Sequence, residues 1–390
     1  MRLADRMGRL GTESAFEVLA RARALEATGR KIISLGIGEP DFDTPAHIVE
    51  AAEQALRDGH THYVPAPGIP PLRDAVSEFL GKHGRLRCAP DQVVVTPGAK
   101  PVMFYAIMAL CQEGDEVLYP DPGFPMYESI ANFAGAKPVP IRLREKNQFR
   151  IDPDELETLV TDRTKLLILS SPENPCGSAL TREDCERIAS IALDRDLMVL
   201  SDEVYWAIRY DGEHASVLDV DGMAERTILL DGWSKTFAMT GWRLGFGVFP
   251  PELVEPVTRL VINTVSCTSA FSQHAAIAAL TGPWEPVEEM VAEFRQRRDV
   301  IVDGLNRLPG ISCVEPGGAF YVFPNVTGTG GSSKEVEEHF LEQAGVATVS
   351  GTAFGQHGEG YIRLSYANSV ENIRDALEAM EASLPDLANR

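Results

Sequence analysis

Residues 165–205, KLLILSSPENPCGSALTREDCERIASIALDRDLMVLSDEVY, predict one strand, one helix and a second strand. KLLILS is an apolar run that ends in a polar loop, and LMVLSD repeats this pattern, as expected of strands buried on both faces. Between them, residues 181–196 have an amphipathic helical pattern that opens with a capping-box signal, Thr181 with Asp184. A strand–helix–strand unit of this kind predicts neighbouring parallel strands in an α/β domain.

The same alternation of short apolar strands and helical segments extends through the middle of the chain. Strand patterns end in a polar or Pro-Gly break at residues 91–98 (DQVVVTPG), 115–123 (DEVLYPDPG) and 226–235 (RTILLDGWSK). Strands that alternate with helices favour a mostly parallel sheet covered by helices on both faces. Ligands of such sheets bind beyond the carboxyl ends of the strands, so polar residues at strand ends are the first candidates for a site.

The two ends of the chain follow a different pattern. Residues 13–28 have a helical pattern, and a longer one follows the middle region, VEEMVAEFRQRRDVIVDGLNRL. Short strands around AFYVFPN and GYIRLSY and a last helix, VENIRDALEAMEASL, complete the C-terminal part. We therefore expect two domains: a large α/β domain over residues 46–285, and a smaller α+β domain built from residues 1–45 and 286–390.

Composition narrows the class of function. The chain has 390 residues, of which 44% are hydrophobic and 24% charged, within the range of globular proteins. Its formal net charge of -21 would repel nucleic acid and anionic membranes, and no apolar run is long enough to span a bilayer. The N-terminal residues MRLADRMGRLGTESAF lack the apolar core of a signal peptide, so a cytoplasmic location is expected. The 6 cysteines form no C-x-x-C pair, and we expect no metal site.

Two strand ends carry the most informative residues for chemistry. Lys235 comes shortly after the apolar strand TILL, and a lysine that forms a Schiff base must lose its proton through burial or a neighbouring cation, here Arg243. Asp202 ends LMVLSD, where a buried carboxylate is costly unless a cation or a donor meets it. Pyridoxal phosphate chemistry combines a lysine with an acid that faces the ring nitrogen. A solvated lysine and a local ion pair or helix cap remain the alternatives.

A turn before a helix offers a place for a phosphate. In TPGAK, residues 96–100, a Pro-Gly pair breaks a strand just before a helix starts. Backbone N–H groups at a helix N-terminus are free donors, and we expect them here on Gly98, Ala99 and Lys100. The pattern is neither a G-x-G-x-x-G fingerprint nor a Walker A loop, so an ordinary βα turn is the alternative.

Three polar side chains suit the remaining parts of such a site. The phenol of Tyr205 and the amide of Asn174 are candidates to hydrogen-bond a ring oxygen, and Asn174 also suits a substrate carboxylate. Arg363 lies on a short alternating strand, and its planar fork would hold a carboxylate by two hydrogen bonds. A core tyrosine, an Asn-Pro turn and an exposed strand arginine are the corresponding structural alternatives.

Together these motifs resemble those of the fold-type I pyridoxal phosphate enzymes, specifically the class I/II aminotransferases of the aspartate aminotransferase superfamily. The resemblance covers almost the whole chain and rests on motifs in a fixed order: SLGIGEPDFDTP (34–45), HYVPAPGIPPLRDAV (62–76), TPGAK (96–100), NPCG (174–177), SDEVY (201–205), SKTFAMTGWRLGF (234–246), PGGAFYVFPN (316–325) and GEGYIRLSYANS (358–369). It implies an enzyme that exchanges an amino group between an L-amino acid and a 2-oxo acid by a ping-pong mechanism.

Two other functions use the same fold. A pyridoxal phosphate-dependent lyase or synthase would share the lysine, the acid and the phosphate-binding arginine, so these residues do not distinguish it from an aminotransferase. A non-catalytic sensor is the second alternative. The presence of both Lys235 and Arg363, together with the net charge of -21, argues against it.

The resemblance implies roles for the residues around the cofactor ring. Lys235 would bind the cofactor covalently and carry a proton between the substrate Cα and the cofactor C4′ atom. Asp202 would keep the ring nitrogen protonated, and Tyr205 and Asn174 would hydrogen-bond the ring oxygen. Phe124 stands where the family stacks an aromatic ring on the cofactor, and most members have Trp or Tyr there. Phenylalanine would keep the stacking but has no polar group that could form a hydrogen bond.

It also implies how the phosphate and the substrate carboxylate are held. The expected phosphate ligands are Gly98, Ala99, Lys100, Ser234 and Arg243, joined by Tyr63 from the neighbouring subunit of a homodimer. Arg363 would bind the α-carboxylate of the substrate, helped by Asn174 and the backbone of Gly38. The partners expected are therefore small amino and oxo acids and a second copy of the chain.

Several positions depart from the family pattern. Cys176 replaces the usual threonine in NPCG, which we expect to be a mild structural change. Gly232 stands where many members have a phosphate-binding serine, so Ser234 would carry more of that role. Glu13 and Ala15 stand where some aspartate-specific members have hydroxyl residues for the distal carboxylate, and this weakens an assignment to aspartate.

Overall fold

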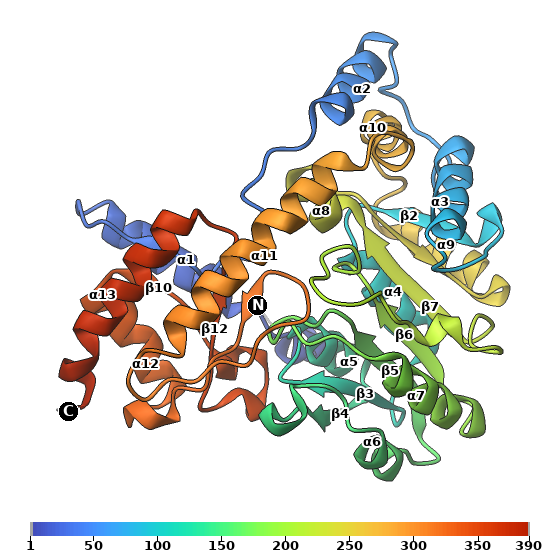
Figure 1. Ribbon diagram of the computed structural model, residues 1–390. Helices are drawn as coiled ribbons and strands as arrows, with labels where there is room; N and C mark the ends of the chain where they lie inside the picture. The colour runs from blue at the N-terminus through green and yellow to red at the C-terminus, as the bar shows by residue number, and fades with distance from the viewer. Residues whose placement is uncertain (1–2, 389–390) are drawn as a thin grey trace.

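The computed structural model describes residues 3–388, without the side chains of residues 14–16 and 388 (Figure 1). Its strands are β1 (Ile33–Ser34), β2 (Val93–Thr96), β3 (Glu116–Asp121), β4 (Lys137–Arg142), β5 (Thr164–Ser170), β6 (Met198–Asp202), β7 (Thr227–Gly232), β8 (Gly245–Val248), β9 (Tyr321–Val322), β10 (Val346–Ala347), β11 (Val349–Ser350) and β12 (Ile362–Ser365). Its α-helices are α1 (Ser14–Glu26), α2 (Ala46–Arg57), α3 (Pro70–Lys82), α4 (Lys100–Leu110), α5 (Met126–Ala134), α6 (Pro153–Leu159), α7 (Arg182–Asp194), α8 (Trp233–Thr236), α9 (Pro251–Thr264), α10 (Ala270–Thr281), α11 (Glu285–Leu305), α12 (Ser333–His339) and α13 (Val370–Ala388).

A seven-stranded sheet in the order β2-β8-β7-β6-β5-β3-β4 forms the centre of the molecule. The strands from β7 to β4 are parallel to one another, and β8 is antiparallel to both of its neighbours. The predicted, mostly parallel sheet is therefore present. In register, Ser170 pairs with Asp202 and Asp202 with Leu230, so the carboxyl ends of β5, β6 and β7 meet at one edge.

Helices cover both faces of this sheet. Successive side chains of a strand point to opposite faces, so the apolar residues of a buried strand need a packing partner on each side. In β5, Leu166 and Ile168 pack in a core cluster with α4, α5 and α9. Leu167 and Leu169 belong to a second cluster with α6 and α7. The helix α7 begins with the predicted capping box: the Asp184 N–H donates to the Thr181 hydroxyl oxygen, and the Thr181 N–H donates to the Asp184 carboxylate. The sequence pattern of residues 165–205 is thus confirmed.

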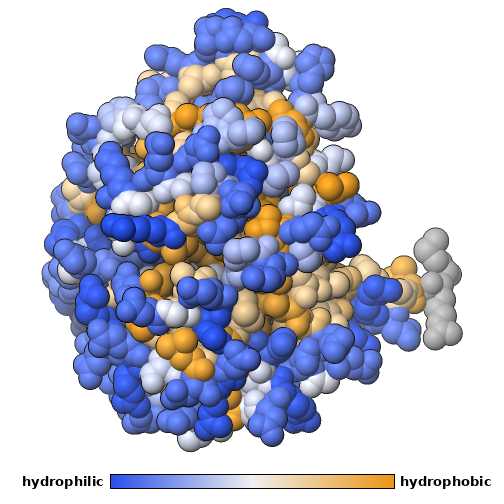
Figure 2. Space-filling model, turned by 90° about the vertical axis from the view of Figure 1, so that its right-hand side faces the viewer, coloured by the Kyte–Doolittle hydropathy of each residue, from blue (hydrophilic) through white to orange (hydrophobic). Residues whose placement is uncertain are grey.

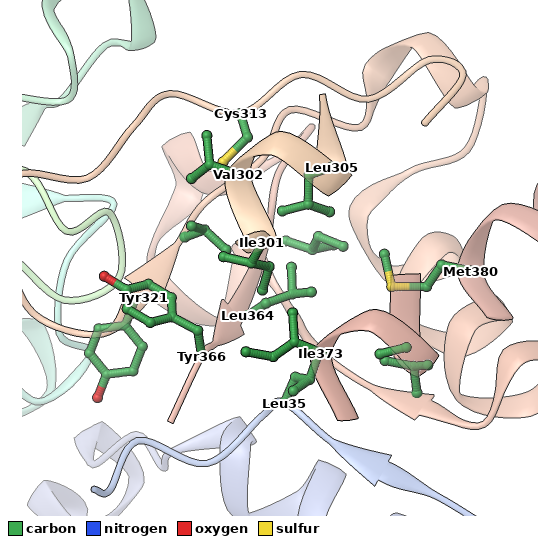
Figure 3. Close-up of a cluster of buried hydrophobic side chains, with 14 of the residues drawn as sticks. Leu35, Ile301, Val302, Leu305, Cys313, Tyr321, Leu364, Tyr366, Ile373 and Met380 are labelled. Carbon is green, nitrogen blue, oxygen red and sulfur yellow. The ribbon is translucent and has the colours of Figure 1, made fainter. Parts of the chain in front are cut away.

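A smaller α+β part lies beside the large sheet (Figure 1). Its antiparallel sheet has the order β11-β12-β9, and β1 pairs with β10 in parallel. A hydrophobic cluster joins α11 and α13 to this sheet, and Leu35 from the N-terminal segment inserts into it beside Leu364 and Ile373 (Figure 3). The N-terminal segment therefore packs with the C-terminal part, although the domain limits at residues 45/46 and 285/286 remain predictions.

Hydrophilic residues cover most of the face seen in Figure 2, with apolar residues exposed in small groups between them. Within residues 3–388, no helix is both long enough and apolar enough to cross a membrane.

Candidate active site

A cavity of about 420 Å³ lies at the carboxyl ends of β5, β6 and β7, where it is also bordered by β12 and by the N-terminal segment. This volume falls in the range of cavities that bind small ligands. The predicted site residues that line it are Gly38, Ala99, Lys100, Phe124, Asn174, Asp202, Tyr205, Ser234, Lys235, Arg243 and Arg363. Two predicted residues, Gly98 and Tyr63, are absent from the described wall of this cavity.

Lys235 enters the cavity from α8, the short helix that directly follows β7. Its ammonium group donates to the Gly38 carbonyl oxygen over 2.5 Å and lies 5.7 Å and 5.6 Å from the ring centres of Tyr205 and Phe320. Burial lowers the pKa of Lys235 to about 8, although the nearby Glu39 carboxylate opposes this shift. The amine is therefore much easier to deprotonate than an exposed lysine, as nucleophilic and proton-transfer chemistry require.

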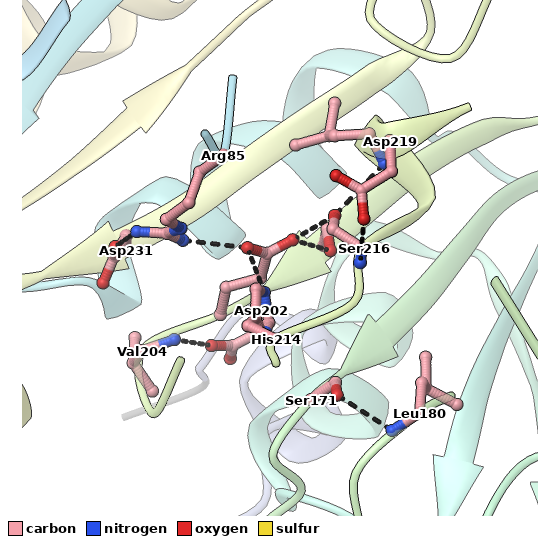
Figure 4. A network of polar contacts seen from close by, with 12 residues as sticks. Arg85, Ser171, Leu180, Asp202, Val204, His214, Ser216, Asp219 and Asp231 are labelled. Carbon is pink, nitrogen blue, oxygen red and sulfur yellow. Dashed lines mark hydrogen bonds and ion pairs between the residues drawn. The ribbon is translucent and has the colours of Figure 1, made fainter. Parts of the chain in front are cut away.

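Asp202 is buried at the end of β6, with 6% of its surface exposed. The Tyr127 hydroxyl donates to its Oδ2 over 2.8 Å. The Val204 N–H donates to its Oδ1 over 3.4 Å (Figure 4). Burial raises the pKa of Asp202 to about 7; the Tyr127 bond opposes this, and the Asp231 and Glu203 carboxylates add to it. Its partners within residues 3–388 are thus neutral donors, and a cation in the cavity, such as a protonated ring nitrogen, would complete its environment.

Two aromatic side chains line the cavity near these residues. Tyr205 is buried, and its hydroxyl lies 2.8 Å from the Tyr321 hydroxyl. Burial holds the pKa of Tyr205 well above its ordinary value, so the phenol keeps its proton and can donate it in a hydrogen bond. Phe124 packs edge-on against Tyr127 with 5.7 Å between ring centres, which fixes its orientation at the cavity wall.

The turn before α4 differs in one respect from the prediction. Gly98 has a φ of 92°, and its N–H donates to the Thr96 carbonyl oxygen over 2.8 Å. The expectation that the Gly98 N–H is a free phosphate donor is therefore wrong, because the left-handed turn folds this N–H back onto its own strand. The helix begins at Lys100, so the N–H groups of Ala99 and Lys100 lie at its N-terminus, where donors have no intrahelical partner.

Arg243 lies directly on this turn. A Cβ atom added to Gly98 would come within 2.3 Å of Arg243 Nη2, so only glycine allows the guanidinium to approach so closely. Arg243 is itself held in the left-handed region, with a φ of 54°, and donates through Nη1 to the Thr240 carbonyl oxygen over 2.9 Å. Ser234 also lines the cavity, so a guanidinium, a hydroxyl and a helix N-terminus converge on one end of it.

Arg363 also lines the cavity, from β12, and is 4% exposed. Its Nη1 donates to Asn174 Oδ1 over 2.9 Å, and its Nη2 donates to the Gly36 carbonyl oxygen over 2.5 Å. The guanidinium carbon lies 4.6 Å from the ring centre of Tyr321 and 4.7 Å from that of Phe354. Contacts with two aromatic rings hold the planar group in place and so fix its orientation.

A carboxylate and an ammonium group meet at the open end of the cavity. Glu13, from the N-terminal segment, forms an ion pair with Lys100. The Glu13 side chain is 17% exposed and the Lys100 side chain 49% exposed, and both line the cavity. Lys100 also lies 5.3 Å from the ring centre of Phe124. The side chain of Ala15, the other N-terminal departure noted in the sequence, lies outside the described residues.

The sequence reasoning missed three aromatic residues of the site and could not place a fourth. Tyr127, Tyr321 and Phe354 hold Asp202, Tyr205 and Arg363 in place, respectively. The available signal was weak: Tyr127 lies only three residues after the predicted site residue Phe124. Tyr63 is 89% exposed, so its expected role toward a neighbouring subunit stays a prediction.

The sequence and the fold match known proteins over nearly their full length. Residues 30–380 match the family model "Aminotransferase class I and II". The chain is 44% identical to an aromatic-amino-acid aminotransferase of Thermococcus litoralis over 99% of both chains, and 46% identical to an aspartate aminotransferase of Pyrococcus abyssi over 92% of this chain and 93% of the relative. The solved structure of the Thermus thermophilus aspartate aminotransferase with maleate is 36% identical, with a TM-score of 0.94 over 98% of this chain and 100% of that one.

Proposed function

The chain belongs to the class I and II aminotransferases, and from this premise we propose which residues carry the reaction and which amino acid is the donor. It is a pyridoxal phosphate-dependent aminotransferase of fold type I, which exchanges an amino group between an amino acid and a 2-oxo acid. When bound, pyridoxal phosphate supplies an electron sink that allows the α-proton of the amino acid to leave.

The donor groups of the cavity fit this cofactor. At one end, Asp202 is a buried carboxylate with neutral donors, which suits a protonated ring nitrogen. At the other end, Arg243 and the start of α4 form a cradle that a Cβ atom on Gly98 would fill, which suits a phosphate. The amine of Lys235 lines the same cavity and has a lowered pKa.

Five side chains would act around the cofactor ring. Lys235 would bind the cofactor at rest and then carry the proton between the substrate Cα and the C4′ atom, because its amine is readily deprotonated. Asp202 would hold the ring nitrogen in its protonated form. Tyr205, which keeps its phenol proton, would donate to the ring oxygen together with the amide of Asn174, and Phe124 would cover one face of the ring.

The two charged ends of the bound molecules would be held by two different arginines. Arg243, Ser234 and the N–H groups of Ala99 and Lys100 would bind the phosphate. Arg363 would bind the α-carboxylate of the substrate, with the Gly38 backbone and Asn174 beside it. Since Arg363 is already oriented by two aromatic rings, the amino acid would enter with its Cα placed toward Lys235.

We propose that the preferred donor is an amino acid with an apolar or aromatic side chain, favoured over aspartate. The observation that carries this proposal is the Glu13–Lys100 ion pair at the open end of the cavity. A second carboxylate on the substrate would lie beside Glu13 and would compete with it for Lys100, which costs free energy. The apolar side chains of Leu19 and Ile37 line the cavity as well and would contact an apolar substrate.

A single-turnover panel tests this specificity. The holoenzyme is mixed with L-phenylalanine, L-leucine or L-aspartate, and conversion of the bound cofactor is followed by absorbance. We expect the two apolar amino acids to react with a kcat/KM at least about tenfold above that of aspartate, which corresponds to about 1.4 kcal/mol. A faster reaction with aspartate would overturn the proposed specificity but not the aminotransferase function, which the panel reports with any of the three donors.

We also propose a homodimer in which Tyr63 completes the phosphate site of the neighbouring subunit. Tyr63 is 89% exposed, so its side chain is accessible to a partner chain. An open groove lined by Arg243, Trp242 and Phe271 adjoins the phosphate end of the cavity and offers a place for the partner chain. The mass in solution tests the dimer. Tyr63→Phe should lower the affinity for pyridoxal phosphate without changing that mass.

The expected cytoplasmic location likewise remains a proposal. All 6 cysteines are free thiols, as is usual in a reducing compartment. Fractionation of the cells that produce the protein would test it.

A further inference from the structure

A buried cluster of charges lies behind Asp202, beside the ends of the two strands that deliver the catalytic residues (Figure 4). Glu203 directly follows Asp202 at the end of β6, and Asp231 lies near the end of β7, four residues before Lys235. Glu203 is 1% exposed and Asp231 2% exposed. Neither side chain lines the cavity, so neither is explained by contact with the cofactor or the substrate.

One arginine joins these two carboxylates. Arg85, from the segment after α3, donates through Nη2 to Glu203 Oε2 over 2.8 Å and through Nη1 to Asp231 Oδ2 over 2.5 Å. Its guanidinium carbon lies 4.3 Å from the ring centre of Trp206, and only 5% of the residue is exposed. Arg85 therefore links the end of β6 to the end of β7 from outside the sheet.

The other oxygens of the two carboxylates are also occupied. Glu203 accepts hydrogen bonds from the hydroxyls of Ser201 and Ser216 over 2.8 Å and 2.6 Å, and His214 Nε2 lies 2.9 Å from its Oε2. Asp231 Oδ1 accepts from the N–H of the next residue over 2.6 Å. A network with this many partners fixes the geometry of its members, and loss of the central cation would leave buried carboxylates without their ionic partner.

The cluster acts on Asp202 through charge as well as through position. The Asp231 and Glu203 carboxylates both raise the pKa of Asp202, because each negative charge makes a further one less favourable. The single positive charge of Arg85 offsets part of theirs, and His214 lies beside Glu203 as well. Without Arg85, less of the negative charge behind Asp202 would be offset, and Asp202 would be harder to ionise.

We propose that Arg85 is a positioning residue for the cofactor: it fixes the ends of β6 and β7 and offsets the charge behind Asp202, so that Asp202 can bind the ring nitrogen as a carboxylate. This inference rests on the proposed roles of Asp202 and Lys235. It assigns to a residue 117 positions before Asp202 (202 - 85) a part in cofactor binding without any contact to the cofactor.

Arg85→Met tests the proposal, with Arg298→Met as the matched control. Arg298, on α11, is also buried, is paired with Asp211 and lies 4.9 Å from the ring centre of Tyr210, but it is away from the cavity wall. The affinity of the apoprotein for pyridoxal phosphate is measured by fluorescence titration, and the absorbance of the bound cofactor is followed against pH. We expect Arg85→Met to weaken the affinity at least about tenfold and to shift the pH midpoint, while Arg298→Met leaves both within about twofold of wild type.

A rescue experiment separates charge from general damage. In the triple variant Arg85→Met, Glu203→Gln, Asp231→Asn the anions are removed together with the cation, and we expect most of the lost affinity to return. If Arg85→Met does not fold, Arg85→Lys takes its place, since it keeps the positive charge but lacks the planar guanidinium that bonds both carboxylates. We expect this variant to bind the cofactor roughly threefold to tenfold more weakly.

Wild-type affinity and an unchanged pH midpoint in a folded Arg85 variant would overturn the proposal. So would an equal loss of affinity in Arg298→Met, because that result would show an effect of stability alone. Failure of the wild-type protein to bind pyridoxal phosphate would instead refute the proposed residue roles, so the two failures are distinguishable.

Discussion

The floor and the mouth of the cavity are built in different ways. The floor consists of Asp202, Tyr205 and Lys235, which lie at or just after the ends of strands in the central sheet and are held by buried partners. The mouth consists of Glu13 and Lys100, which are partly exposed, and one of them comes from the N-terminal segment. The floor is thus fixed by the fold itself, whereas the mouth depends on a segment that docks onto it.

This difference suggests a division of labour. The floor would carry the chemistry that all amino acids share, since every donor has the same Cα and amino group. The mouth would discriminate between substrates by their side chains. A change at the floor should therefore affect all substrates equally, and a change at the mouth should affect them unequally. The following predictions test this contrast, from the largest expected effect to the smallest.

The largest effect is expected from Lys235→Ala at the floor. Loss of the proton carrier alone should lower kcat by roughly 10²–10⁴-fold, and loss of the covalent anchor should lower it further for every donor alike. Single-turnover rates with two donors measure this, and circular dichroism checks the fold. Lys165→Ala, an exposed lysine on β5, is the control. Transamination at the wild-type rate would show that the floor is misassigned.

The second prediction concerns the ionisation of Asp202 in the apoprotein. Its pKa of about 7 lies above the ordinary value of 3.8, so the folded state binds the proton more tightly than the unfolded state does. This contribution to stability is complete below about pH 4 and is lost as the pH rises through 7, by at most about 4 kcal/mol. The Asp202→Asn variant has no carboxyl group at this position, so it lacks this pH-dependent contribution to stability.

Urea unfolding of both apoproteins at several pH values measures this effect. The free energy of unfolding of the wild type should fall relative to that of Asp202→Asn between pH 4 and pH 7, and added pyridoxal phosphate should reduce the fall in the wild type. Parallel pH profiles for the two proteins would contradict the assignment of Asp202 as a buried acid without a cation.

Arg363→Ala should weaken amino-acid binding for all donors. The loss of a buried, charge-assisted pair costs about 3 kcal/mol, or roughly a hundredfold in apparent affinity. Affinity for pyridoxal phosphate should change little, because the contacts of Arg363 are with Asn174, Gly36, Tyr321 and Phe354 and include none of the proposed phosphate ligands. Substrate titrations of the half-reaction give the first quantity and fluorescence gives the second. An equal loss of affinity for the amino acid and for pyridoxal phosphate would exclude a specific role of Arg363 in binding the substrate carboxylate.

The smallest effect, and the only unequal one, is expected at the mouth. Glu13→Gln frees Lys100 from its partly exposed ion pair, worth about 1 kcal/mol or less. The kcat/KM for aspartate should rise by up to about fivefold, while that for phenylalanine stays nearly constant. Glu17→Gln, an exposed glutamate in the first turn of α1, is the control. An equal change in kcat/KM for aspartate and phenylalanine would contradict the proposed distinction between floor and mouth.

The floor could be predicted from the sequence because parallel strands end at one edge of a sheet. Asp202, Tyr205 and Lys235 lie at or just after the ends of the apolar strands β6 and β7, and the topology brings them into one cavity. The donors that hold them could not be predicted in this way. The sequence gives no sign of the roles of Tyr127 and Arg85, because neither directly follows a strand. Their partners are also far away in sequence.

The remaining differences come from backbone geometry and from docking. The N–H of Gly98 was expected to be free, but a turn with positive φ directs it to Thr96, and glycine gives no sign of which turn it will form. The ion pair of Glu13 with Lys100 joins residues 87 positions apart and depends on where the N-terminal segment packs. Periodicity predicts that this segment is helical, not where it lies.

The long helix α11 has a mechanical consequence for the enzyme. Its 21 residues run without interruption from the end of the large sheet region into the small α+β part, a length of about 30 Å. A rigid rod of this length is a lever: a rotation of one degree at its first turn moves its far end by about 0.5 Å. Ile301 and Leu305 of α11 pack in the same hydrophobic cluster as Leu364, the neighbour of Arg363 on β12. A rotation of the helix near Glu285, well outside the cavity, would therefore be passed to the strand that carries Arg363.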